Sequence, residues 1–132
     1  MRLKDAAVEI RKSRFPEPVK SVCLNLTDWM ARSEPAQLAF LTPSQLAGVA
    51  GDKVDSTLLM TSLTALTSSS FAILEVGGYV LDEAGSIVEI DDETLFSALE
   101  FDVFVHPLSG EKLERARDIV HVFYALREGI AL

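Results

Sequence analysis

The chain has 132 residues, one cysteine and a formal net charge of −8, and 48% of its residues are hydrophobic. This length predicts one domain with a core of its own, and the apolar content excludes wholesale disorder. The N-terminal stretch is charged throughout, and no segment has the apolar length that a membrane span needs. We therefore expect a cytoplasmic protein, in which the single Cys23 rules out an intramolecular disulfide.

The charge is distributed unevenly along the chain. Residues 1–20 carry six basic and three acidic side chains, a net +3, whereas the remaining residues carry six basic and seventeen acidic ones, a net −11. Between Glu34 and Glu100 the only basic residue is Lys53. This asymmetry is consistent with a basic arm on an acidic body, and also with an ordinary solvated first helix, which is the more common arrangement.

Two helices are predicted at the start of the chain. Apolar residues recur at spacings of three and four in residues 3–13. Pro16 and Pro18 end this pattern, because the residue before a proline avoids the helical region. A second apolar stripe, in residues 19–32, predicts the next helix.

The clearest local signal is the start of a third helix. Thr42 is a favoured N-cap, Pro43 suits the first helical position, and Gln45 stands three residues after the cap, as in a capping box. A helix is therefore predicted from Pro43 to about Ala50, and Gly51 can adopt the left-handed conformation that ends a helix.

Another helix is predicted directly afterwards, from about Lys53 to Ser68, with Asp52 as its N-cap. Leucines at helical spacing supply its buried side, and hydroxyl side chains lie mainly on the opposite side. The outward-facing threonines in this prediction are Thr57, Thr61 and Thr64.

A pair of strands is predicted after these helices. Residues 71–81 are rich in strand formers, and Gly77-Gly78 within them predicts a bulge or bend. Residues 82–85 have the composition of a type I turn with glycine in the left-handed position, and residues 86–90 return as the partner strand.

The rest of the chain is predicted to form an extension. Acidic residues 91–93 open a short helix or loop, and residues 101–105 are a candidate third strand. An apolar stripe predicts a final helix at residues 111–127, capped by Ser109, which either packs on the core or forms a dimer interface. Candidate partner-binding residues on this helix are Val122 and Tyr124.

The order of these elements resembles a winged helix-turn-helix domain over about residues 19–91. The resemblance is carried by a Leu-Ala pair in the first helix of the motif, a glycine in the turn, leucines in the second helix and the following hairpin. These residues are Leu46-Ala47, Gly51, Leu59, Leu63 and Leu66. One or two extra residues separate the Leu-Ala pair from the later leucines, compared with the family's usual pattern. The resemblance implies an α+β fold with a winged-helix core at 19–91. Outside it, the charge pattern predicts a basic arm at 1–18, and residues 92–132 form the predicted extension.

Winged-helix domains bind DNA or serve as protein-binding adaptors and subunits, so the resemblance implies either use. Affinity for DNA needs several basic side chains on phosphates, but the predicted recognition helix offers only Lys53, and the hairpin turn carries Asp82 and Glu83. We therefore expect a non-catalytic binding subunit whose partner is another protein or a second copy, with the threonine side of the second helix as one contact surface. The alternative is a sequence-specific transcription regulator. Its DNA-binding residues would be Arg11, Lys12, Arg14 and Lys53.

No group of residues predicts catalysis. His106 and His121 have no cysteine or carboxylate cluster at metal-ligand spacing, so we expect structural roles for both. The acids at 91–93 suit a helix start, where the helix dipole favours negative charge. Nucleophile, phosphate-loop and dinucleotide motifs are absent. We therefore expect no enzymatic activity, metal, cofactor, membrane contact or small-molecule ligand.

Overall fold

The computed structural model describes residues 2–68, 72–105, 112–114 and 119–131, and it has the α+β composition that the sequence predicts. The chain forms two compact units. Unit 1 comprises Met1–Glu75 and Tyr124–Leu132, and unit 2 comprises Val76–Phe123. The sequence predicted domain boundaries after residues 18 and 91. These differ from the boundaries of the two units, and the predicted domains stay a prediction. Among the described residues, no helix combines the length and the apolar character that crossing a membrane requires.

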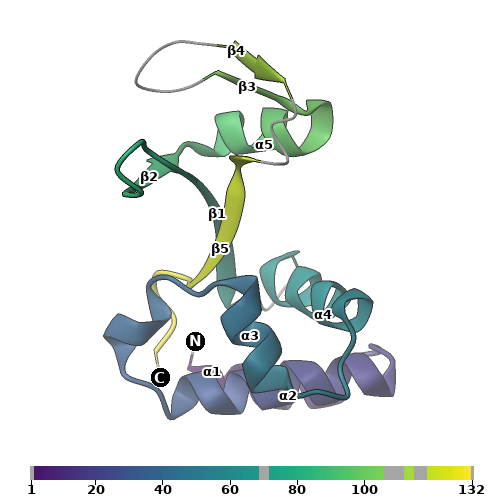
Figure 1. Cartoon of the computed structure of the whole chain (residues 1–132). Coiled ribbons are helices and arrows are strands. Elements are labelled where there is room, and N and C mark those ends of the chain that lie inside the picture. Colours follow the sequence, from purple (N-terminus) through teal and green to yellow (C-terminus); the bar gives the residue numbers. More distant parts are fainter. Residues whose placement is uncertain (1, 69–71, 106–111, 115–118, 132) are drawn as a thin grey trace. The chain divides into compact units, whose positions relative to one another are not determined.

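Unit 1 is built mainly from helices. They are α1 (Leu3–Lys12), α2 (Glu17–Ala31), the short 3₁₀ helix η1 (Pro35–Leu38), α3 (Pro43–Ala50) and α4 (Ser56–Ser68) (Figure 1). The second helix, α2, packs against α1, α3 and α4. Its buried side chains, which include Val22, Leu26 and Met30, therefore form the centre of this unit's core.

The helix starts show how local sequence signals act. The Gln45 amide donates to the Thr42 hydroxyl over 3.2 Å, which confirms the predicted cap of α3. Gly51 has a φ of 103°, but its ψ of 163° lies outside the left-handed helical region that we predicted for it. The cap predicted for α4 is wrong, because the Leu58 amide donates to the Asp55 carboxylate over 2.8 Å and the helix begins three residues later than expected.

Unit 1 is completed by the last residues of the chain. The Leu41 amide donates to the Tyr124 carbonyl and the Tyr124 amide donates to the Leu41 carbonyl, both over 2.7 Å. The Arg127 amide donates to the Ile73 carbonyl over 2.8 Å. These bonds pair the segment before α3 with a strand from the end of the sequence, because each buried backbone group needs a partner.

Unit 2 contains most of the strands. The elements after α4 are β1 (Leu74–Leu81), β2 (Ile87–Ile90), α5 (Asp92–Phe101), β3 (Val103–Val105), β4 (Lys112–Glu114) and β5 (His121–Leu126). A three-stranded antiparallel sheet has the order β2-β1-β5, and β3 pairs with β4 in a separate antiparallel ribbon. The buried core of this unit consists of Val80, Leu95, Ala98 and Val120.

The β1–β2 hairpin has the predicted turn. The Gly85 amide donates to the Asp82 carbonyl over 2.9 Å, and Gly85 has a φ of 82°. The Asp82 carboxylate accepts from the amides of Ala84 and Ser86 over 2.9 and 2.8 Å. This aspartate therefore holds the turn in place, as aspartate commonly does by bonding to the backbone that follows it.

Gly77 and Gly78 lie within β1. The pairing of β1 with β2 is regular from Gly78, opposite Ile90, to the end of the strand. A Cβ atom on Gly77 would lie 2.5 Å from the Phe123 ring, and one on Gly78 would lie 2.7 Å from the Leu95 side chain. The glycines are needed because other side chains pack directly against the strand backbone.

The predicted C-terminal helix at residues 111–127 is wrong, because β4 and β5 occupy much of this range. Its apolar residues suit a helix, but the run from His121 to Tyr124 is also rich in β-branched and aromatic residues, which favour strands. Pairing with β1 decides the outcome, because β5 supplies the second neighbour of that strand. The cap predicted at Ser109 and the residue His106 lie outside the described residues.

Candidate functional site

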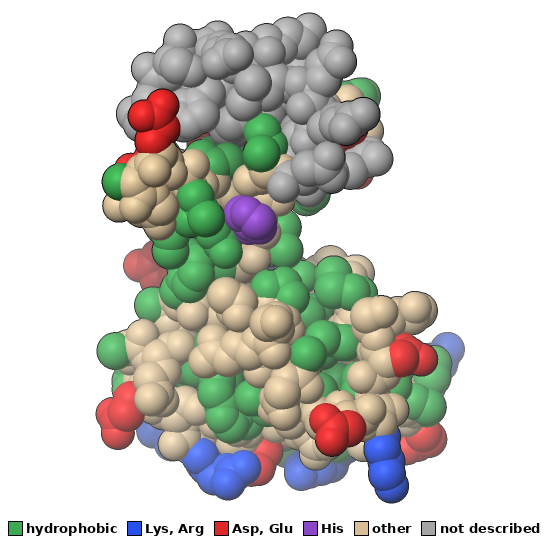
Figure 2. Space-filling model, viewed as in Figure 1, with side chains coloured by type: hydrophobic (Ala, Val, Ile, Leu, Met, Phe, Trp, Pro, Cys, Tyr) green, Lys and Arg blue, Asp and Glu red, His purple; other side chains and the backbone are tan. Residues whose placement is uncertain are grey.

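The outward side of α4 is the candidate contact surface. Ser56, Thr57, Met60, Thr61 and Thr64 line an open hollow there, and we call these five residues the threonine face. The three predicted threonines are exposed and therefore share one surface, as the helical spacing predicts. Figure 2 shows that hydrophobic side chains, other uncharged side chains and backbone make up most of the visible surface of unit 1 over α3 and α4.

The threonine hydroxyls already donate to their own helix. The Thr61 hydroxyl donates to the Thr57 carbonyl, and the Thr64 hydroxyl donates to the Met60 carbonyl, each over 2.8 Å. A hydroxyl has one hydrogen to donate, so its outer side offers only acceptor lone pairs. Phosphate oxygens are acceptors too, so in this conformation the Thr61 and Thr64 hydroxyls are poorly suited to contact a nucleic-acid backbone.

Met60 gives the threonine face an apolar centre. Its side chain is 42% exposed, and the sequence analysis did not identify it. Methionine is flexible and polarisable, and it is common at surfaces that adapt to different protein partners. Met60 stands three residues after Thr57 and four residues before Thr64, so helical spacing places it on the same side of α4. This spacing could have identified Met60 from the sequence.

The predicted basic residues do not join the threonine face. Arg11, Lys12 and Arg14 are exposed at and beyond the end of α1, a helix that packs against α2. Both α1 and α4 contact α2, and Figure 1 shows α1 and α4 on different sides of that helix. Lys53 is exposed in the turn before α4, where Asp52 and Asp55 flank it.

The second predicted contact surface is not formed. Val122 lies on β5, is half-buried and packs against the core of unit 2. Tyr124 is only 5% exposed, and burial raises the pKa of its hydroxyl. The prediction of both as contact residues assumed a helix with one outward side, whereas the strand directs these side chains towards packed neighbours.

The charge of the chain is concentrated in unit 2. This unit contains eleven acidic and three basic side chains, a net −8, whereas unit 1 contains nine of each and is neutral. Most of the acidic excess of residues 21–132 therefore lies in the unit that carries the hairpin and α5. Such a field repels polyanions and attracts basic partners.

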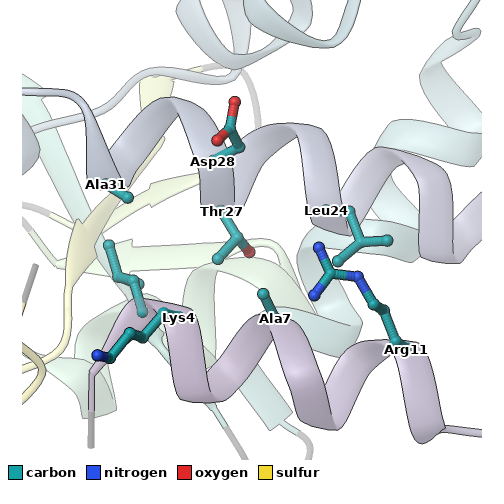
Figure 3. A pocket seen from close by; sticks show the side chains of 8 residues that line it. Lys4, Ala7, Arg11, Leu24, Thr27, Asp28 and Ala31 are labelled. Atoms are coloured by element: carbon teal, nitrogen blue, oxygen red, sulfur yellow. The ribbon is translucent and has the colours of Figure 1, made fainter.

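A groove in unit 1 was not predicted from the sequence. It lies between α1 and α2, has a volume of about 220 Å³, and is lined by apolar and charged side chains (Figure 3). These are Leu3, Lys4, Ala7, Arg11, Leu24, Thr27, Asp28 and Ala31. The small side chains of Ala7 and Ala31 are its only signal in the sequence, and the groove becomes recognisable only once the packing of the two helices is known.

The remaining reactive groups have structural surroundings. The Tyr79 and His121 rings stack with their centroids 5.1 Å apart. The Thr94 amide donates to the Asp91 carboxylate over 2.7 Å, which confirms the predicted helix start and lowers the pKa of Asp91. Within the described part of the chain, no cluster of three or more histidine, cysteine or carboxylate side chains could hold a metal ion.

Comparison with protein-family models, with curated proteins and with solved structures gave no match.

Proposed function

We propose that the protein is a non-catalytic binding subunit with a winged-helix-like motif, which contacts a protein partner through the threonine face of α4. The order of α3, a glycine turn, α4 and the β1–β2 hairpin supports the motif. The uncharged threonine face, with an exposed methionine at its centre, is the observation that carries the functional proposal.

Two further observations favour a protein over DNA as the partner. The hairpin turn carries Asp82 and Glu83 within a unit of charge −8, so it would repel phosphates. The exposed cations of α1 lie on a helix that α2 separates from α4, so they would not bind the same duplex segment as α4. DNA binding requires several basic contacts at one surface, and this arrangement does not provide them.

Site-specific photo-crosslinking in cells of the source organism tests the proposal. A photoreactive amino acid at Thr61 should yield a discrete protein adduct, and Met60→Glu should abolish it, because a charge at the centre of the face is unfavourable against an apolar partner. Ala36, which is exposed on η1, is the matched control position and should give no such adduct. Equal adducts at both positions, or none at Thr61, would contradict the proposal.

The DNA alternative has a separate test. Titration of duplex DNA at physiological salt should detect no binding tighter than the roughly 10⁻⁴–10⁻⁶ M that is typical of non-specific contacts. Tighter binding that weakens with salt and with Lys53→Ala would favour the transcription regulator instead.

A further inference from the structure

An exposed aromatic pair marks a second surface, on α5. Phe96 and Phe101 are 57% and 67% exposed, and their rings meet edge to face with centroids 6.0 Å apart. Single exposed apolar side chains are common, but adjacent large ones indicate a contact surface. Leu99, 42% exposed on the same helix, extends the patch.

Two carboxylates accompany the aromatic pair. Asp92 and Glu93 stand four and three residues before Phe96, so they lie one helical turn away on the same side of α5. Both side chains are exposed. The surface therefore combines a large apolar side chain with negative charge, and its complement is an apolar hollow beside positive charge.

The groove between α1 and α2 has these complementary properties. Ala7 and Leu24 contribute apolar surface, and Lys4 and Arg11 stand seven residues apart on α1, which is about 10 Å along a helix. Figure 3 shows the Lys4 and Arg11 side chains extending from either side of Ala7. Neither cation makes an ion pair within the described part of the chain, whereas Asp28 on the opposite wall pairs with Arg32 over 3.0 Å.

We propose that this groove binds α5 of a second copy of the chain. The Phe96 ring enters the groove, and Asp92 and Glu93 lie beside Lys4 and Arg11. A cavity of about 150 Å³ can hold a benzene molecule, so the groove, at about 220 Å³, has room for a phenyl ring. This surface is separate from the threonine face, so either proposal can fail without the other.

The contact uses different surfaces on the two copies. One copy supplies the groove and the other supplies α5, which makes the interface heterologous unless two such contacts form reciprocally. Because opposite charges flank an apolar contact, salt should weaken the association without removing it.

Sedimentation velocity over a range of protein concentrations tests the association. The wild-type chain should self-associate, and raising the salt from about 50 to about 500 mM should weaken this association. Phe96→Ala and Arg11→Glu should each weaken it at least about tenfold, as expected for the central residues of a contact. Ile87→Ala removes a side chain that is similarly exposed on the hairpin, so it should leave association unchanged.

A mixing experiment identifies the two surfaces. The Phe96→Ala chain retains an intact groove, and the Arg11→Glu chain retains an intact α5. At the concentration where the wild-type chain associates, each variant alone should be mainly monomeric, but a mixture should form a heterodimer through the one wild-type contact that remains. Circular dichroism verifies that both variants are folded. A monomeric wild-type chain, or folded variants that do not associate when mixed, would overturn the proposal.

Discussion

Burial decides the chemistry of Cys23. Its side chain is inaccessible to solvent, its thiol donates to the Ser62 carbonyl over 3.7 Å, and burial raises its pKa to about 11. The thiolate is the reactive form, so alkylation of the native chain should be much slower than alkylation of the unfolded chain at pH 8. Fast alkylation of the folded protein would contradict this packing.

The raised pKa also gives stability a pH dependence. The native thiol retains its proton between its unfolded pKa near 9 and its native pKa of about 11, whereas the unfolded thiol loses it. The contribution of this thiol to stability is therefore complete below pH 9 and declines as the pH rises through this window. Thermal unfolding of the wild type and Cys23→Ala should show a smaller decline in the variant over this range.

Gly77 is required by the packing of one aromatic ring. A Cβ atom there would lie 2.5 Å from Phe123, so Gly77→Ala should destabilise the fold by about 1–3 kcal/mol through overpacking. Gly48 is the matched control, because it lies within α3 and a Cβ atom added to it would meet no atom within 4 Å beyond its chain neighbours and the backbone of its own helix. Gly48→Ala should stabilise the chain by about 0.5–1 kcal/mol, and urea unfolding measures both changes.

Among the secondary-structure elements, α4 offers a test of which residue caps it. Asp55→Ala removes the acceptor of the Leu58 amide and should reduce stability by about 1 kcal/mol. Asp52→Ala removes a similar carboxylate from the preceding turn and should have little effect. Equal losses in urea unfolding would mean that both aspartates cap the helix.

The elements that the sequence predicted correctly depend on local signals. Thr42 bonds to an amide three residues away, and Asp82 organises a turn of its immediate neighbours. The start of α4 was wrong because Asp52 and Asp55 are both suitable caps, and the Val54 amide instead bonds to Gly51 in the turn.

Long-range contacts decided the features that the sequence did not predict. Residues 121–126 satisfy a helical and a strand pattern, and only pairing with β1 selects the strand. The same holds for the candidate surfaces. The helical period of α4 predicted its threonine face, but the burial of Tyr124 and the groove between α1 and α2 depend on packing between distant segments.

At the scale of the whole molecule, the separation of charge leads to opposite effects of salt. Unit 2 contains eleven acidic side chains and only three basic ones, so repulsion among its carboxylates opposes its folding. In the proposed contact between copies, two of these carboxylates, Asp92 and Glu93, attract the cations of α1. Salt screens both interactions, because the Debye length falls from about 30 Å at 0.01 M to about 3 Å at 1 M.

The thermal midpoint of the dilute, monomeric chain should therefore rise with added salt, while the proposed self-association at high protein concentration should weaken. Asp92→Asn with Glu93→Gln removes two negative charges from unit 2 with little change of shape, so it should reduce both salt effects together. Calorimetry at low protein concentration and sedimentation at high concentration measure them separately. A midpoint that falls with salt in the monomer would show that attraction, and not repulsion, dominates the charges of unit 2.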